Sequence, residues 1–331
     1  MANGRMSCAW AGAAILATAA TPSPAPGQAE VAAAGRYEAV ARALDVAIAR
    51  EVRAKEIPAL SIALVDGEAI VWAMGFGRAD PGSNVPATAE TVYRVGSVSK
   101  LFADIALMQL VEQEKLDLDA PARLAVPEFN VVPPSGRDIT LRHLMSHRAG
   151  IVREPPLGSY FDPTGPTLEA TVASLASTMS VYEPEARIKY SNAGIAVVGR
   201  AVERLAGVPF ADAVRRSVIA PLGLTRTDFE PPTEMARARA KGLMWTLDGR
   251  TFPAPTFKLG TSSAGDLEST AIDLGKFLIA LFADGQEPGG PILKPEGTGH
   301  GGRRRGGGLR TPADPRGGRG HLPGQANSAD R

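Results

Sequence analysis

The chain has 331 residues, of which 44% are hydrophobic and 21% charged, as in an ordinary globular protein. The 36 lysines and arginines nearly balance the 35 acidic residues, so the net charge of +1 argues against a nucleic-acid-binding protein. A single cysteine, Cys8, excludes an intrachain disulfide, and the four histidines lack metal-binding spacing, so we expect neither a metal nor another cofactor.

The first thirty residues are predicted to form a leader outside the fold. Arg5 precedes an apolar run of small residues from Cys8 to Ala20, and Pro- and Ala-rich sequence follows. A run of this length suits the core of a signal peptide and is too short to span a membrane. We therefore expect a signal peptide within residues 1–30 and a periplasmic or secreted protein. The alternative is an unstructured Ala/Pro-rich leader.

The hydrophobic pattern between residues 36 and 293 predicts a mixed α/β domain. Apolar residues recur at every fourth position over 36–56, which indicates an amphipathic helix that ends before Pro58. Alternating residues at 60–64 and 69–77, on either side of a turn, predict a β-hairpin. Further helices are expected at 101–112, 141–146, 168–177, 194–205, 210–218 and 271–282.

The strongest local signal is the segment 94–100, RVGSVSK, directly before the predicted helix at 101–112. Ser97 and Lys100 are three residues apart, so they share one face of a helical turn. A serine hydroxyl becomes a good nucleophile only when a base removes its proton, and a desolvated lysine can do so. The alternative is a helix-capping serine followed by an exposed lysine.

A second signal, Tyr190-Ser191-Asn192, precedes the predicted helix at 194–205. A tyrosine beside a lysine ammonium ionises below its ordinary pKa of about 10 and can act as a base and then as an acid. An asparagine two residues further on can hydrogen-bond a substrate amide or the lysine. The alternative is a helix cap formed by Ser191 or Asn192, next to a half-buried tyrosine.

Together these two segments, about ninety residues apart, resemble the serine β-lactamase and penicillin-binding-protein superfamily. The tyrosine version is similar to the branch of class C β-lactamases, D-alanyl-D-alanine carboxypeptidases and esterases. The resemblance covers residues 36–296, because flanking segments are also similar at 57–63 (IPALSIA), 115–121 (KLDLDAP), 139–147 (ITLRHLMSH), 273–281 and 292–296.

The resemblance implies an α/β fold in which an antiparallel sheet is flanked by helices and a mainly helical region is inserted between its strands. It implies that Ser97 is the acylated nucleophile, with Lys100 as its proton partner and Tyr190 as the general base and acid. Asn192 would bind the substrate or the lysine, and the Ser97 N–H would supply half of an oxyanion hole. We therefore expect a serine hydrolase that acts on a small-molecule or peptide substrate, through an amide, β-lactam or ester bond.

The superfamily's third motif, Lys-Thr-Gly or His-x-Gly on an edge strand, has one candidate here, His300. It lies within five residues of Glu296, although the superfamily has tens of residues and a strand pair in that interval. Two strands alone bury too little surface for a stable sheet. His300 is therefore only a candidate substrate-binding residue, and we expect the C-terminal strands of the sheet to be missing.

The predicted domain at 36–296 is followed by a Gly/Arg-rich tail at 297–331. From residue 301 onward it has seven arginines and two aspartates, a net charge of +5, which leaves −4 for the first 300 residues. Our hypothesis is that the reading frame shifts near Glu296. The alternative is a disordered basic tail, and the arginine run at 303–305 has no aromatic neighbour that would indicate nucleic-acid binding.

Two other residues are weaker candidates. Ser262 lies in a sequence that loosely resembles the G-x-S-x-G nucleophile elbow, but the final glycine and a preceding strand are absent, so we expect a loop. His147 follows a predicted helix end, where histidines cap carbonyl groups or pack.

For the whole chain, the alternative to an active hydrolase is a catalytically impaired remnant or a non-catalytic binding protein of the same fold. The oligomeric state is left open.

Overall fold

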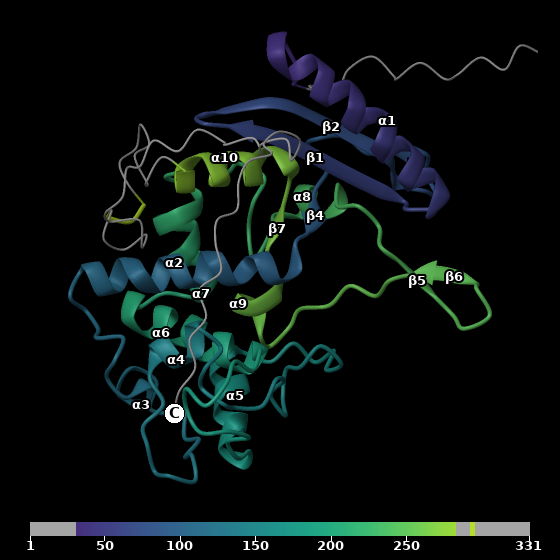
Figure 1. The fold of residues 1–331 in the computed structure, drawn as a ribbon. Helices are drawn as coiled ribbons and strands as arrows, with labels where there is room; N and C mark the ends of the chain where they lie inside the picture. The colour runs from purple at the N-terminus through teal and green to yellow at the C-terminus, as the bar shows by residue number, and fades with distance from the viewer. Residues whose placement is uncertain (1–30, 283–291, 295–331) are drawn as a thin grey trace, which may run out of the picture.

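Residues 31–282 and 292–294 are described by the structure, a computed structural model whose arrangement is shown in Figure 1. The leader at 1–30, the tail at 297–331 and His300 lie outside these residues, so the inferences made about them stay predictions. Among the helices of the described ranges, none has the length and apolar character needed to cross a membrane.

The N-terminal part is an antiparallel hairpin of β1 (Ala59–Asp66) and β2 (Ala69–Asp80), as predicted. The turn between them contains Gly67 with a φ of 57°, a left-handed conformation that glycine adopts without steric penalty. β3 (Val85–Pro86) pairs with the end of β2, so the sheet order is β1-β2-β3. Within the described ranges β1 pairs with β2 alone. The expectation that C-terminal strands are missing concerns residues outside these ranges and stays a prediction.

Two helices cover opposite faces of this hairpin (Figure 1). The apolar side of α1 (Glu38–Ala54) packs against Trp72 and Phe76 on one face. On the other face, α10 (Ala271–Phe282) lies so close to β2 that a Cβ on Gly275 would meet Cδ1 of Ile70 at 2.9 Å. The observed architecture is therefore an antiparallel sheet flanked by helices, which confirms the predicted fold class.

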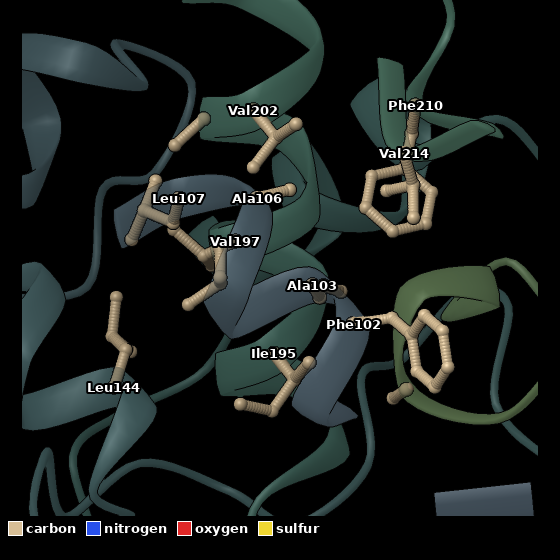
Figure 2. Close-up of a cluster of buried hydrophobic side chains, with 14 of the residues drawn as sticks. Phe102, Ala103, Ala106, Leu107, Leu144, Ile195, Val197, Val202, Phe210 and Val214 are labelled. Carbon is tan, nitrogen blue, oxygen red and sulfur yellow. The ribbon is translucent and has the colours of Figure 1, made fainter. Parts of the chain in front are cut away.

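The helical body is centred on α2 (Ser99–Glu112), which packs against α6 (Asn192–Ala206) and α9 (Ser262–Gly265). Because α2 is apolar on several sides, it is buried on several sides, as its sequence predicts. Figure 2 shows part of the resulting core, with Phe102, Ala103, Ala106 and Leu107 from α2, Ile195, Val197 and Val202 from α6, and Leu144, Phe210 and Val214 from neighbouring helices.

Shorter elements complete the fold. The helix predicted at 168–177 is α5 (Leu168–Ala173) followed by a 3-10 turn, and the one predicted at 210–218 is α7 (Phe210–Val214) followed by a π-helical turn. Strands of two or three residues escaped prediction because so short a segment shows no alternation. The elements not yet named are the 3-10 turns Gly35–Tyr37 and Gly96–Val98, β4 (Tyr93–Arg94), α3 (Ala122–Ala125), α4 (Leu141–Met145), α8 (Thr233–Arg237), β5 (Leu243–Trp245), β6 (Thr251–Pro253) and β7 (Glu268–Ser269).

Phe102 is the side chain that joins the helical body to the sheet layer. It is fully buried, and its ring stacks on Phe277 of α10 with a centroid distance of 4.4 Å. We expect Phe102→Ala to lower the free energy of unfolding by about 3–5 kcal/mol, because a cavity remains where the ring was. Urea denaturation measures this. Phe161→Ala is the control, since that ring is 87% exposed, and a change above about 0.5 kcal/mol there would contradict the burial argument.

Candidate active site

Ser97 lies in a tight turn between β4 and α2. The 3-10 turn Gly96–Val98 joins these two elements, and Gly96 has a φ of 54°. Ser99 fixes the turn from within α2, because its Oγ donates to the Gly96 carbonyl at 2.5 Å and accepts from the N–H of Leu267 at 3.0 Å. Ser99 of α2 thus links the turn that carries Ser97 to Leu267, the residue before β7.

Lys100 lies in the first turn of α2 and is only 6% exposed. Its Nζ donates to Ser97 Oγ at 3.1 Å and to the carbonyl of Ala264 at 2.7 Å. Asp104 lies one turn further along α2, where burial raises its pKa to about 7 against the lowering effect of the Lys100 charge. The shared face of Ser97 and Lys100 is confirmed, and the alternative of an exposed lysine is wrong.

The phenol of Tyr190 also contacts Ser97. Its hydroxyl lies 2.6 Å from Ser97 Oγ, and the Lys100 Nζ lies 4.9 Å from the centre of its ring. Burial raises the pKa of Tyr190, but the Lys100 and Ser97 side chains beside the phenol and the charge of Arg153 outweigh it, so the pKa lies below its ordinary value. The Ser97 hydroxyl therefore lies within hydrogen-bond distance of the Tyr190 phenol, which can accept its proton when ionised, and of the Lys100 side chain.

Ser191 and Asn192 have different roles at the start of α6. Ser191 is the N-cap of α6, with its Oγ accepting from the N–H of Gly194 at 2.9 Å. Asn192 is the first residue of that helix, and its Nδ2 donates to Oε1 of Glu154 at 2.6 Å. Of the two partners considered for Asn192, the lysine receives no hydrogen bond from it, because its Nδ2 donates to Glu154. Substrate binding by Asn192 stays a prediction.

His147 is part of the support for Tyr190. Its ring packs on the Tyr190 ring with a centroid distance of 4.5 Å, and its Nδ1 accepts from the N–H of Ser191 at 3.3 Å. Burial lowers the pKa of His147, and the charge of Lys100 lowers it further, which favours the neutral form of the ring. The sequence suggested that His147 caps carbonyl groups or packs, and in the structure its ring packs on Tyr190.

A cleft of about 490 Å³ opens beside Ser97. Its walls include the start of β1, the segment that carries Glu154 and Tyr160, the first residue of α6 and the hairpin of β5 and β6, which projects from the body in Figure 1. Clefts of this size with a few converging polar groups are where small molecules bind. Sequence reasoning missed the Glu154 contact, which depends on a loop folding against α6.

Ser262 does not line the cleft that contains Ser97. It begins α9 instead of lying in the expected loop, and it lines a separate cavity of about 800 Å³ that none of the three residues Ser97, Lys100 and Tyr190 borders. The nucleophile elbow is therefore absent there. In the part of the chain that the structure describes, no group of three or more His, Cys, Asp or Glu side chains could hold a metal ion.

A serine held between a buried lysine and a tyrosine, at the start of a helix beside an antiparallel sheet, defines the β-lactamase-type class of serine hydrolases. The sequence model of the Beta-lactamase family matches residues 44–324 of the chain. The chain therefore belongs to the Beta-lactamase family. The match continues past the predicted domain end at 296, and that boundary stays a prediction.

Individual proteins show the same likeness. The chain is 30% identical over 242 residues to "Penicillin-binding protein 4" of Amycolatopsis lactamdurans, a match that covers 71% of this chain and 62% of that protein. Among solved structures, a penicillin-binding protein homologue from Pyrococcus abyssi, described as octameric, is 28% identical, with a TM-score of 0.69 and 78% and 59% of the two chains covered. D-amino acid amidase from Ochrobactrum anthropi is 26% identical, with a TM-score of 0.64 and 77% and 74% covered. The chain spans 46–62% of the length of the first curated relatives that it matches.

Proposed function

We propose that the protein is a serine hydrolase that forms an acyl-enzyme on Ser97. The observation that carries this proposal is the pair of short contacts to one hydroxyl, 2.6 Å to the phenol of Tyr190 and 3.1 Å to the ammonium of Lys100. Ser97 itself lines an open cleft, so a carbonyl group can reach its hydroxyl from solvent.

In the proposed reaction, the Tyr190 phenolate takes the Ser97 proton while Oγ attacks the substrate carbonyl carbon. The Lys100 charge stabilises the phenolate, and the Ser97 N–H donates to the carbonyl oxygen as it becomes negative. The C–N or C–O bond to the leaving group then breaks, and the Tyr190 hydroxyl returns its proton to that group. A water molecule hydrolyses the resulting ester by the same steps in reverse order.

The substrate class is a small molecule or peptide with an amide, β-lactam or ester bond. The relatives support the amide side of this range, since they include a penicillin-binding protein and a D-amino acid amidase. Specificity depends on the walls of the cleft, which the shared fold does not fix.

Three chromogenic substrates test the proposal on the full chain: p-nitrophenyl acetate, a chromogenic cephalosporin and phenylalanine p-nitroanilide. We expect turnover of at least one of them, with the acyl-enzyme detectable by intact mass. If the folded protein hydrolyses none of the three substrates and is acylated by none of them, the proposal is contradicted. Cephalosporin binding without acylation would instead favour the non-catalytic alternative that the sequence left open.

The pH profile gives a finer test of the Tyr190 base. A base acts when deprotonated, so kcat/KM rises with pH through the pKa of Tyr190, and the lowered pKa places this rise below pH 10. Arg153 lies 5.4 Å from the ring centre, and its charge helps to keep that pKa low. We expect Arg153→Gln to move the rise to higher pH by about 0.2–0.7 unit, since an exposed charge pair contributes about 0.2–1 kcal/mol. An unchanged profile, or a shift to lower pH, would contradict this.

A further inference from the structure

The segment 264–268, from the end of α9 to the start of β7, lies against the segment that carries the reacting serine. At one end β4 pairs with β7, with Arg94 opposite Glu268. At the other end Nζ of Lys100 donates to the carbonyl of Ala264 at 2.7 Å. The position of this segment therefore decides where an acceptor of the buried lysine lies.

The side chain of Arg94 holds the middle of that segment. Its Nη2 forms an ion pair with Asp266, and its Nε donates to the carbonyl of Gly265 at 3.4 Å, one residue after Ala264. Its Nη1 donates to the carbonyl of Phe257 at 2.9 Å. The guanidinium thus binds three different groups through its three nitrogens, which the single ammonium of a lysine cannot reproduce.

The ion pair of Arg94 and Asp266 is shielded from solvent on its acidic side. The side chain of Asp266 is 9% exposed and that of Arg94 27%. The second oxygen of Asp266 accepts from the N–H of Leu259 at 2.9 Å. Removing one partner of such a pair leaves a buried charge uncompensated, so the segment has to rearrange. The position of the Ala264 carbonyl therefore depends on this ion pair.

The Ala264 carbonyl is a contact of Lys100 that takes no part in the proposed reaction. Ser97 Oγ, which accepts from Nζ at 3.1 Å, loses its proton and becomes part of the acyl-enzyme. A displacement of about 1 Å at a reacting centre can cost about 10²-fold in rate. The carbonyl can therefore hold the ammonium beside the Tyr190 phenol while the bonds of Ser97 change.

We propose that Arg94 is a positioning residue: through its ion pair with Asp266 it fixes the carbonyl that binds the Lys100 ammonium. This role rests on the proposed hydrolase function and adds to it a residue that acts through another. It predicts that loss of Arg94 lowers kcat more than it raises KM. It also predicts that the influence of Lys100 on Tyr190 weakens.

Steady-state kinetics on full-length Arg94→Met tests the effect on rate. We expect kcat to fall by about tenfold or more and KM to change by less than about threefold, as misplacement of a reacting group produces. Arg94→Lys keeps a positive charge beside Asp266 but not all three contacts, so its kcat should lie between those of Arg94→Met and the parent. A higher KM at the parent kcat would show that Arg94 contacts the substrate instead. That result, or parent kinetics in both variants, would overturn the proposal.

Arg215 provides the matched control. It binds both oxygens of Asp228, at 2.7 and 2.8 Å, and the two side chains are 37% and 10% exposed, similar to the pair of Arg94 and Asp266. Neither Arg215 nor Asp228 lines the cleft. Arg215→Met should lower the melting temperature as Arg94→Met does, and keep kcat within about twofold of the parent. An equal loss of kcat in Arg94→Met and Arg215→Met would show general destabilisation and overturn the proposal.

The ionisation of Tyr190 gives a readout that needs no turnover. The phenol ring faces Lys100, Arg153 and His147, and the charges of Lys100 and Arg153 lower the pKa of Tyr190. The absorbance of the phenolate, titrated with pH and corrected by the same titration of the matching Tyr190→Phe protein, measures this pKa. We expect it to rise by about 0.5 unit or more in Arg94→Met, because the ammonium is no longer held beside the phenol.

This titration separates the positioning role of Arg94 from the hydrolase function. A raised pKa of Tyr190 in Arg94→Met, but not in Arg215→Met, supports the role even if the parent hydrolyses none of the substrates. An unchanged pKa in both Arg94→Met and Arg94→Lys would overturn it, even if the parent is acylated on Ser97. If Arg94→Met does not fold, Arg94→Lys decides, since it retains the charge and should shift the pKa in the same direction.

Discussion

Replacing Ser97 by alanine is expected to abolish acyl-enzyme formation and to lower kcat/KM by on the order of 10⁴-fold or more. No other described hydroxyl has both an ammonium at 3.1 Å and a phenol at 2.6 Å, so no neighbouring side chain can take over the attack. The turn that carries Ser97 is held by Ser99 and not by the Ser97 hydroxyl, so the variant should fold normally. Steady-state kinetics on the best of the three chromogenic substrates, with intact mass after mixing, measures the effect.

Ser262→Ala is the matched control for this substitution. It removes a hydroxyl from the other serine that the sequence made a candidate nucleophile, and it does so in a separate cavity. We expect its kcat/KM to stay within about twofold of the parent protein. Substantial activity in Ser97→Ala, or a large loss of activity in Ser262→Ala, would contradict the assignment of Ser97 as the nucleophile.

The second large effect is expected for Tyr190→Phe, which should lower kcat/KM by about 10²–10⁴-fold, the usual contribution of a general acid–base group. Phenylalanine keeps the ring packing on His147 and the contact of the ring with the Lys100 ammonium, and removes only the hydroxyl at 2.6 Å from Ser97. The rise of kcat/KM with pH that Tyr190 causes should disappear as well. The measurement is a pH profile of the variant beside that of the parent.

Tyr182→Phe controls for the loss of a tyrosine hydroxyl, because Tyr182 contacts Arg187 through its ring and does not line the cleft. It should leave both the rate and the pH profile unchanged. A Tyr190→Phe protein with the parent rate would identify Lys100, and not Tyr190, as the base that removes the Ser97 proton.

The long elements and the local spacing of the site were predictable from the sequence. The hairpin at 60–77 and the helix at 101–112 follow from periodicity, because burial of one face or of several sides dictates where apolar residues recur. The contact between Ser97 and Lys100 follows from their separation by three residues in the first turn of a helix. Tyr190 could be assigned to the same site as Ser97 and Lys100 only through the family resemblance. Nothing in its local pattern indicates a partner about ninety residues away.

Contacts that depend on loops were not predictable. Glu154 meets Asn192 because the segment after α4 folds against the start of α6, and no short-range pattern encodes that approach. His147 packs on Tyr190 for the same reason. The pairing of β4 with β7 joins segments about 175 residues apart through only two residues each, which is too short for alternation to appear. His300 and the tail lie outside the described residues, so the third motif and the frame hypothesis stay predictions.

Peptide mapping after reaction with a fluorophosphonate probe tests the central claim most directly. The probe reacts with an activated serine, and digestion followed by mass spectrometry identifies which residue carries it. We predict one equivalent of label per chain, on Ser97, with none in Ser97→Ala and strongly reduced labelling in Tyr190→Phe. Label on another residue, such as Ser262, or a folded protein in which Ser97 stays unlabelled, would contradict the assignment of Ser97 as the nucleophile.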